Sequence, residues 1–286
     1  MNQPVNLREI QARMKEAAAA ARLPLRGGRW SGAAGGVPGR STGSSIDFHD
    51  QRQYVPGDDP RHINWQASAR TGSYTMKLYR EEVTPRIDLV CDTSGSMFLT
   101  TAKERRVWEL FYFCIESGLR IGGHLRLHLL SRTAGGLPEE VPLARPLADD
   151  WPPCPAAAPG IAPANAAETA APALLADQIE RVPLRAGSLR VVVSDLLDES
   201  PPGRVAAALS AGGSRAIVLV PAAREESDPD WDGNVDFLDV ERGTRRLDRV
   251  DPAILGRYRA AYRRHFVIWR EECARRGVGQ IGRAHV

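Results

Sequence analysis

The sequence predicts a mainly parallel, doubly wound α/β fold of the Rossmann type, preceded by a small β-rich extension. Continuous apolar segments such as RIDLVCD (86–92), LRVVVSD (189–195) and RAIVLV (215–220) are typical of strands buried on both faces of a sheet. Helix-like segments alternate with them, which is the order that covers both faces of a parallel sheet. With 286 residues, 43% of them hydrophobic, the chain can bury one main core and a smaller appendage.

Residues 1–45 are expected to form an N-terminal arm. An alanine-rich helix is predicted over residues 5–22, and the Gly- and Ser-rich stretch after it predicts flexible chain up to Ser45. Residues 46–85 alternate short apolar and polar runs around VPGDDPRHIN, whose Pro, Gly and Asp residues favour a turn, so we expect a β-rich extension there. We expect Trp65 to anchor this extension by packing on the main domain.

The main domain is expected over residues 86–280. Helices are predicted where apolar residues recur every three or four positions, and strands where they alternate or run continuously. The elements expected after the first strand are a helix at 102–121, a strand at 124–130, a short strand at 141–147, a helix at 169–182, the strand at 189–195, a short helix at 205–210, the strand at 215–220, a hairpin at 235–250 that turns at Arg242 and Gly243, and a long helix at 251–276.

The composition of the chain bears on its binding partners and on the cellular compartment in which it is expected. Basic and acidic residues nearly balance, 38 against 35, which does not favour nucleic-acid or membrane-surface binding. The four cysteines lie far apart and form no CxxC pair, which favours a reducing compartment. The N-terminus lacks the apolar core of a signal peptide, and no window is apolar for long enough to span a membrane, so we expect a cytoplasmic protein without a membrane span.

A group of oxygen-bearing side chains is expected at the carboxyl edge of the sheet, where open α/β sheets bind ligands. Asp92 ends a strand, and Ser94 and Ser96 follow it at alternate positions in VCDTSGSM. Asp195 ends a second buried strand, and Thr169 begins the helix before that strand. Carboxylate and hydroxyl oxygens suit a hard dication, so these five residues are candidate ligands of Mg²⁺, with Mn²⁺ as the other possibility.

Two carboxylates leave a dication much of its charge, and an acidic residue of a partner protein could replace one of its waters. The same residue types also suit an ordinary strand-to-helix turn with an N-cap, which is the alternative reading of Asp92, Ser94 and Ser96.

The segment DTSGSM, with Thr169 and Asp195, resembles the metal-ion-dependent adhesion site of von Willebrand factor A domains. The upstream block FHDQRQYVPGDDPRHINWQASARTGSYTMKLYREE resembles the signature of the bacterial family called domain of unknown function 58. The two resemblances together cover roughly residues 24–280. They imply a non-enzymatic, Mg²⁺-dependent protein-interaction module that acts beside a MoxR-type AAA+ ATPase in chaperone-like assembly or maturation of other proteins.

The resemblance also implies one more buried strand after the long helix. Residues 281–286, IGRAHV, instead read like a translated sequencing adapter, so we expect a non-native tail and a sheet that lacks its last strand through truncation. Such a sheet would expose an edge.

Two other functions stay open at this point. A metal-dependent hydrolase or phosphoryl-transfer enzyme could use Asp92 or Ser94 as its nucleophile, although no histidine lies near the motif in sequence to serve as a base. A nucleic-acid-binding protein could use the arginine-rich arm and the last helix, and it would bind with strong salt dependence. No Walker A or dinucleotide-binding glycine pattern is present, so no nucleotide site is expected in this chain.

Overall fold

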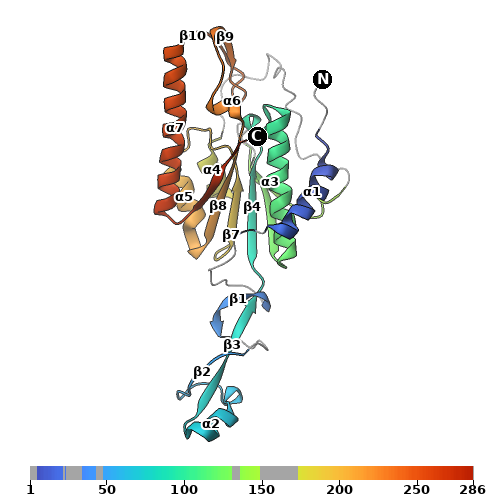
Figure 1. The fold of residues 1–286 in the computed structure, drawn as a ribbon, viewed down its shortest axis with the longest axis vertical. Coiled ribbons are helices and arrows are strands. Elements are labelled where there is room, and N and C mark those ends of the chain that lie inside the picture. The colour runs from blue at the N-terminus through green and yellow to red at the C-terminus, as the bar shows by residue number, and fades with distance from the viewer. Residues whose placement is uncertain are drawn as a thin grey trace.

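The computed structural model describes residues 5–21, 23, 34–42, 48–130, 136–148 and 173–285. An α/β body carries a narrow extension that projects from one end (Figure 1). The prediction of an α/β fold with a mainly parallel sheet and an N-terminal β-rich extension is confirmed at this level.

The sheet of the body has six strands in the order β11-β8-β7-β4-β5-β6. Five of them pair in parallel, and β6 pairs antiparallel with β5 at one edge. The strands are β4 (Arg86–Asp92), β5 (His124–Leu130), β6 (Glu139–Val141), β7 (Leu189–Val193), β8 (Arg215–Ala222) and β11 (Gly279–His285).

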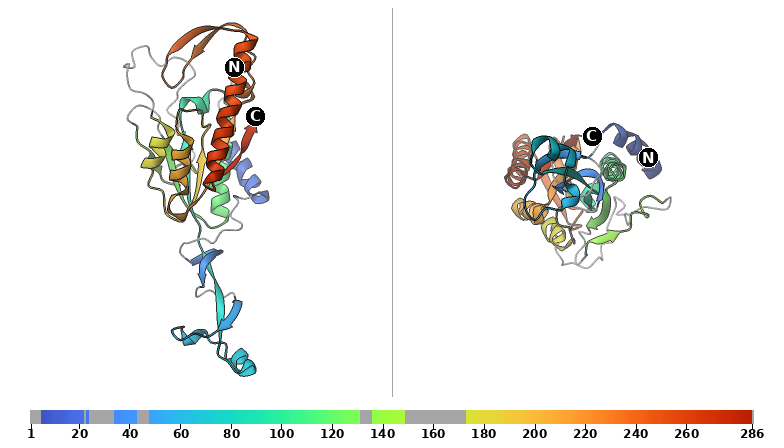
Figure 2. Two further views of the ribbon diagram at one scale, coloured as in Figure 1. Left: turned by 90° about the vertical axis from the view of Figure 1, so that its left-hand side faces the viewer. Right: turned by 90° about the horizontal axis from the view of Figure 1, so that it is seen from below.

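Helices cover both faces of this sheet, as Figure 2 shows from below. On β4, Leu89 and Cys91 pack in the core under one layer of helices, while Val90 between them packs in the core on the opposite face. Such burial on both faces explains why Leu89, Val90 and Cys91 are all apolar. The first layer contains α1 (Leu7–Ala20) and α3 (Thr101–Arg120), and the second contains α4 (Leu175–Arg181), α5 (Pro202–Ser210) and α7 (Pro252–Arg275).

The chain order creates a topological switch point between β4 and β7. From β4 the chain proceeds to β5 and β6 on one side, then returns to β7 on the other side of β4. Connections leave these neighbouring strands in opposite directions, and in open α/β sheets the ligand crevice lies outside the carboxyl ends of such strands. Asp92 at the end of β4 and Ser194 and Asp195 directly after β7 therefore meet at this crevice.

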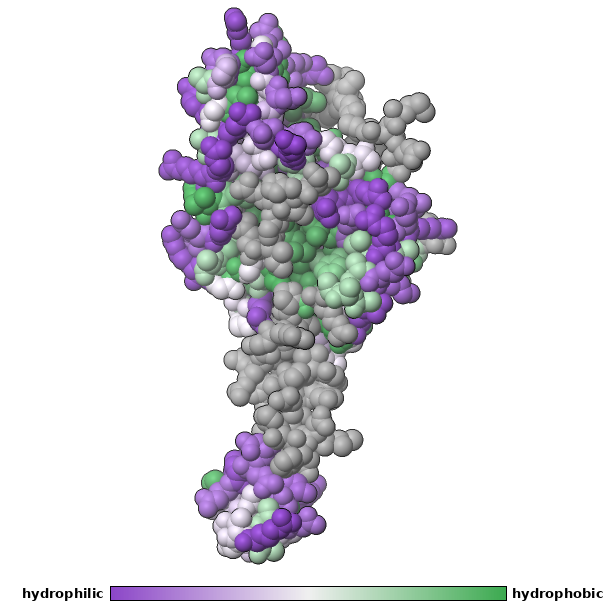
Figure 3. All heavy atoms as spheres, in the orientation of Figure 1, coloured by the Kyte–Doolittle hydropathy of each residue, from purple (hydrophilic) through white to green (hydrophobic). Residues whose placement is uncertain are grey.

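A separate two-stranded hairpin lies at the same end of the body. It comprises β9 (Gly233–Leu238) and β10 (Arg245–Val250), and its turn includes the predicted Arg242 and Gly243. Short helical segments η2 (Gly95–Phe98), η3 (Ala211–Gly213) and α6 (Arg224–Ser227) complete the body. The outer surface of the hairpin is mostly hydrophilic (Figure 3), as its arginine-rich β10 strand would lead one to expect.

The extension is a three-stranded antiparallel sheet in the order β1-β3-β2. Its strands are β1 (Ala34–Thr42), β2 (Phe48–Gln53) and β3 (Thr75–Val83), and it also contains η1 (Pro60–His62) and α2 (Trp65–Thr71). The expectation of flexible chain as far as Ser45 is wrong for 34–42, because β1 pairs with β3 through backbone hydrogen bonds, which Gly- and Ser-rich chain can also form.

The expected anchoring role of Trp65 is also wrong. Its helix α2 lies at the far tip of the extension, away from the body (Figure 1). The Trp65 side chain is 63% exposed and contacts Tyr74 edge to face within the extension itself. The contact with Tyr74 covers part of the Trp65 ring within the extension, so Trp65 needs no contact with the main domain.

The expectation that the sheet lacks its last strand is contradicted by β11. Residues 279–285 pair in parallel with β8 after the long helix α7. Strand pairing uses backbone groups, so residues without an apolar pattern can still form an edge strand. The strand predicted at 141–147 is misplaced, because the structure has a strand at Glu139–Val141 that shares only Val141 with it. The described part of the helix predicted at 169–182 begins at Leu175.

Candidate cation site

Asp92 is the centre of the candidate site. It ends β4 and is completely buried. Its Oδ1 accepts a hydrogen bond of 2.9 Å from the backbone N–H of Ser94, and its Oδ2 accepts one of 2.7 Å from the hydroxyl of Ser194. These bonds fix the carboxylate at the switch point and offset part of the cost of burying it.

The two motif serines converge beside this carboxylate. The hydroxyl oxygens of Ser94 and Ser96 lie 3.1 Å apart. Adjacent ligand oxygens around an octahedral Mg²⁺ with bonds of about 2.1 Å are themselves about 3.0 Å apart, so the spacing fits two ligands of one ion. Ser94 stands at the N-cap position of η2, yet its side chain forms no capping hydrogen bond. The alternative of a plain N-cap therefore does not describe Ser94.

Asp195 is paired with a buried lysine. Its Oδ2 lies 2.9 Å from Nζ of Lys103, and both side chains are fully buried. The same ammonium contacts Oε1 of Glu226, whose side chain is 13% exposed. Oδ1 of Asp195 accepts a 3.1 Å hydrogen bond from the N–H of Leu197.

This arrangement determines the charge of the buried cluster. Burial by itself would lower the pKa of Lys103, but the neighbouring Asp195 and Glu226 carboxylates outweigh burial and raise it above 10.5. Lys103 is therefore an ammonium ion at neutral pH. Burial raises the pKa of Glu226 above 4.5 although Lys103 opposes the shift. The positively charged ammonium of Lys103 thus lies directly against the carboxylate of Asp195.

The loop after β7 is held in an unusual backbone conformation. Leu196 has a φ of 58°, and it is the one non-glycine residue with positive φ among the residues that the structure describes. This left-handed conformation costs about 1 kcal/mol or more for a branched side chain. The loop is held by the Ser194 hydroxyl, which accepts from the Leu196 N–H, and by His265 Nε2, which donates to the Leu196 carbonyl at 2.7 Å. Strain retained in this way is typical of functional loops.

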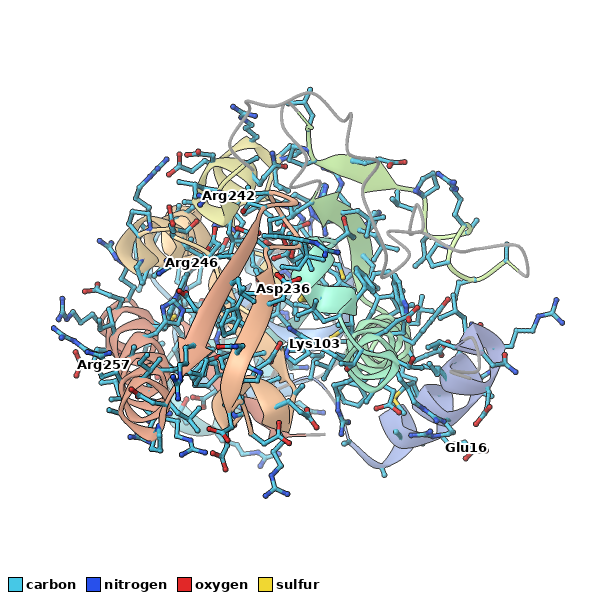
Figure 4. All side chains as sticks on the ribbon, turned by 90° about the horizontal axis from the view of Figure 1, so that it is seen from above. Glu16, Lys103, Asp236, Arg242, Arg246 and Arg257 are labelled. Atoms are coloured by element: carbon cyan, nitrogen blue, oxygen red, sulfur yellow. The ribbon has the colours of Figure 1, made fainter. Side chains whose placement is uncertain are left out.

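The β9–β10 hairpin reaches the motif loop from outside the sheet. Oε1 of Glu241 accepts a 3.1 Å hydrogen bond from the N–H of Ser96. A Cβ added to Gly95 would lie 3.4 Å from the carbonyl oxygen of Val240, so the two segments are in close contact. Seen from above, the hairpin crosses the end of the body, and Lys103 of helix α3 lies beside it (Figure 4).

The structure thus brings Asp92, Ser94 and Ser96 together, as the sequence predicts. Asp195 borders the same crevice, but its carboxylate is engaged by Lys103 and by its own loop. Thr169 lies outside the described residues. Sequence reasoning did not find Ser194, Lys103, Glu226 and Glu241. Ser194 could have been noticed as a hydroxyl next to Asp195, whereas the other three come from separate elements with no motif.

The residues present fit a hard dication. The candidate ligands, which are the carboxylate of Asp92 and the hydroxyls of Ser94 and Ser96, all offer oxygen, which suits Mg²⁺ or Mn²⁺ better than Zn²⁺. In the described ranges, no group of three or more His, Cys, Asp or Glu side chains is placed to hold a metal. A cation at this crevice would therefore depend on the serine hydroxyls. Those hydroxyls are neutral, so the bound ion would keep much of its charge for an acidic ligand.

Comparison of the sequence with known protein families gives a match to part of the chain. Residues 50–118 match the model of the family described as "Protein of unknown function DUF58". This match supports the resemblance to that family over a segment that is less than half of the chain. The segment contains the tip of the extension, the whole of β4, the DTSGSM loop and most of α3. No curated protein matches the chain.

Among solved structures, an aerotolerance-related membrane protein from Bacteroides fragilis, carrying multiple mutations to serines, is similar to this chain. The sequence identity is 14%, the alignment covers 70% of this chain and 91% of that chain, and the TM-score is 0.35. A likeness this weak supports no inference. None of the described helices of this chain is long and apolar enough to cross a bilayer.

Proposed function

We propose that this protein is a non-enzymatic, divalent-cation-dependent protein-interaction module of the von Willebrand factor A type. In this proposal Asp92, Ser94 and Ser96 hold Mg²⁺, or Mn²⁺ in its place, and the cation binds an acidic residue of a partner protein. Asp195 and Thr169 belong to the expected ligand set. Asp195 would act from beside the ion, through a water ligand, because its carboxylate is already paired with Lys103.

The observation that carries the proposal is the spacing of the two serine hydroxyls beside a buried carboxylate at the switch point. The Ser94 hydroxyl is not used for capping, and each hydroxyl would be a neutral ligand that leaves charge on the ion. When bound, the cation would supply the positive charge that attracts an acidic ligand. The protein's residues would hold the ion at the carboxyl edge of the sheet.

The resemblance to the domain of unknown function 58 family supports a MoxR-type AAA+ ATPase as the partner. Such a pair would act in chaperone-like assembly or maturation of client proteins. The extension lies at the end of the body opposite to the crevice (Figure 1). A cytoplasmic location accords with this partnership.

The first experiment measures binding of Mg²⁺ and Mn²⁺ to the full chain by isothermal titration calorimetry, for the natural protein and for Asp92→Asn. Asparagine keeps the shape of the side chain and removes its charge. We expect one site, and about tenfold weaker binding or more in the variant because a charged ligand is lost. Co-purification with a MoxR-type AAA+ ATPase then tests the partner. Co-purification that persists undiminished in EDTA and in Asp92→Asn would overturn the proposal.

The same variant tests the enzymatic alternative. The hydroxyl of Ser94 has the hydroxyl of Ser96 as its hydrogen-bond partner, and a hydroxyl is a poor general base. Both oxygens of Asp92 accept hydrogen bonds, which reduces its strength as a nucleophile. Turnover of phosphate or ester substrates that is lost in Asp92→Asn would favour the enzyme instead.

A further inference from the structure

We propose that Glu241 is an additional ligand of the cation, supplied by the β9–β10 hairpin, and that it occupies the position that a partner's acidic side chain would take. This inference rests on the proposed cation site and assigns it an internal acidic ligand. A partner would then bind by displacing the tip of the hairpin.

The position of Glu241 is the first argument. Its Oε1 lies 3.1 Å from the backbone nitrogen of Ser96. The nitrogen and the hydroxyl oxygen of a serine are joined through only Cα and Cβ, so the carboxylate is next to a candidate ligand oxygen. It approaches from the solvent side of the sheet edge, whereas Asp92 and Asp195 are fully buried. An incoming ligand would also have to approach from that side.

The build of the hairpin tip is the second argument. Oδ1 of Asp239 accepts hydrogen bonds from the N–H groups of Glu241 and Arg242, at 2.9 and 3.1 Å. The N–H of Gly243 donates to the Asp239 carbonyl, and φ is +67° at this glycine. The tip is therefore a defined turn that presents Glu241 in one direction. Preorganisation of this kind reduces the entropic cost of ligation.

The attachment of the hairpin is the third argument, because it is limited in extent. The hairpin forms its own two-stranded sheet and pairs with no strand of the body. On its outer side, Arg242 contacts Glu199 at 3.7 Å, an exposed pair of little energetic value. Near the motif, Val240 packs against Gly95 without a clash. Moving the tip therefore breaks no strand pairing with the described strands of the body, which favours an exchangeable ligand.

A structural role for Glu241 makes a different prediction. If Glu241 only caps the first turn of η2 through the Ser96 N–H, a neutral acceptor should serve equally well. Glu241→Gln keeps an oxygen acceptor of the same length and removes the charge. Glu199→Gln is the matched control, because Glu199 is an exposed carboxylate near the same hairpin with 79% of its side chain accessible.

The test measures Mn²⁺ affinity by calorimetry and water proton relaxation of the bound Mn²⁺, using the full chain. We expect Glu241→Gln to bind Mn²⁺ about tenfold more weakly and to show higher relaxivity, because water takes the vacated coordination position. Glu199→Gln should match the natural protein in both. Unchanged affinity and relaxivity in Glu241→Gln, with binding lost in Asp92→Asn, would overturn the inference and leave the cation site standing. Absence of any Mn²⁺ binding by the natural protein would overturn both.

A crosslink tests the displacement step. The Cβ built on Gly95 lies 3.6 Å from the Cβ of Val240, which is within the range for a disulfide. Gly95→Cys/Val240→Cys is made in a Cys154→Ser background. The remaining thiols are buried, and burial raises the pKa of Cys114 to about 12 and that of Cys273 to about 11, which suppresses side reactions.

Acetate is the probe of this second test. Acetate should bind to the Mn²⁺-loaded reduced variant by taking the position of Glu241, and it should bind more weakly to the oxidised variant, whose hairpin tip cannot leave. Calorimetry measures both affinities. The reduced form of the same protein is the control for the substitutions. Equal responses to acetate in the two forms would show that the hairpin does not compete for the site.

Discussion

The buried Lys103 ammonium offers the sharpest test of how the site is stabilised. Methionine at this position keeps an unbranched chain of similar length and a similar helix propensity, but it removes the charge. Asp195, fully buried, and Glu226, 13% exposed, would then face each other without a counter-ion. Breaking a buried ion pair by removing one partner costs about 3–5 kcal/mol. We expect Lys103→Met to lower the free energy of unfolding by about this amount.

Urea denaturation, analysed by linear extrapolation, measures the change. The loss should depend on pH in a defined direction. Burial already raises the pKa of Glu226, and removal of Lys103 would raise it further. A carboxyl whose folded-state pKa is raised stabilises the fold at low pH and loses that contribution as pH rises through the folded value. The deficit of Lys103→Met should therefore be smaller at acidic pH than at neutral pH.

Glu226→Gln provides the second arm of a double-mutant cycle. Combined with Lys103→Met it removes one of the two unpaired carboxylates, so the double variant should be more stable than Lys103→Met alone. A loss below about 1 kcal/mol in Lys103→Met, the value of an exposed ion pair, would refute the reasoning. So would a loss that does not vary with pH.

Two further predictions concern residues away from the site. His128 is 1% exposed, and neither ring nitrogen has a hydrogen-bond partner among the described residues. Burial lowers its pKa below 6.5, so the folded state binds fewer protons than the unfolded state under mildly acidic conditions. The free energy of unfolding should fall by about 1 kcal/mol between neutral pH and about pH 5, and His128→Leu should remove that part of the pH dependence in urea titrations; an unchanged slope would contradict the assignment. Trp65→Ala should change stability by less than about 0.5 kcal/mol because the ring is largely exposed at the tip of the extension, and a loss of 2 kcal/mol or more in the same assay would show that it packs on the body after all.

The sequence predicted the fold where local pattern and global structure agree. Runs of consecutive apolar residues identified β4, β7 and β8, because a strand buried on both faces has no solvent-facing side that favours alternate polar residues. The spacing of Tyr262, Phe266, Trp269 and Cys273 identified α7, which buries all four. Pattern failed at β1 and β11, since these strands are held by backbone pairing that leaves little trace in side-chain type.

The DTSGSM motif determined by itself that a carboxylate and two hydroxyls follow a strand end, because neighbours in sequence must be neighbours in space. Only the tertiary structure decided what surrounds them. Lys103 comes from α3, Glu226 from α6 and Glu241 from the hairpin tip, and the packing of these elements places them at the crevice. Pairing with Lys103 changed the role expected for Asp195. Long-range charge pairs of this kind have no periodicity or spacing in sequence, so they become visible only once the chain has folded.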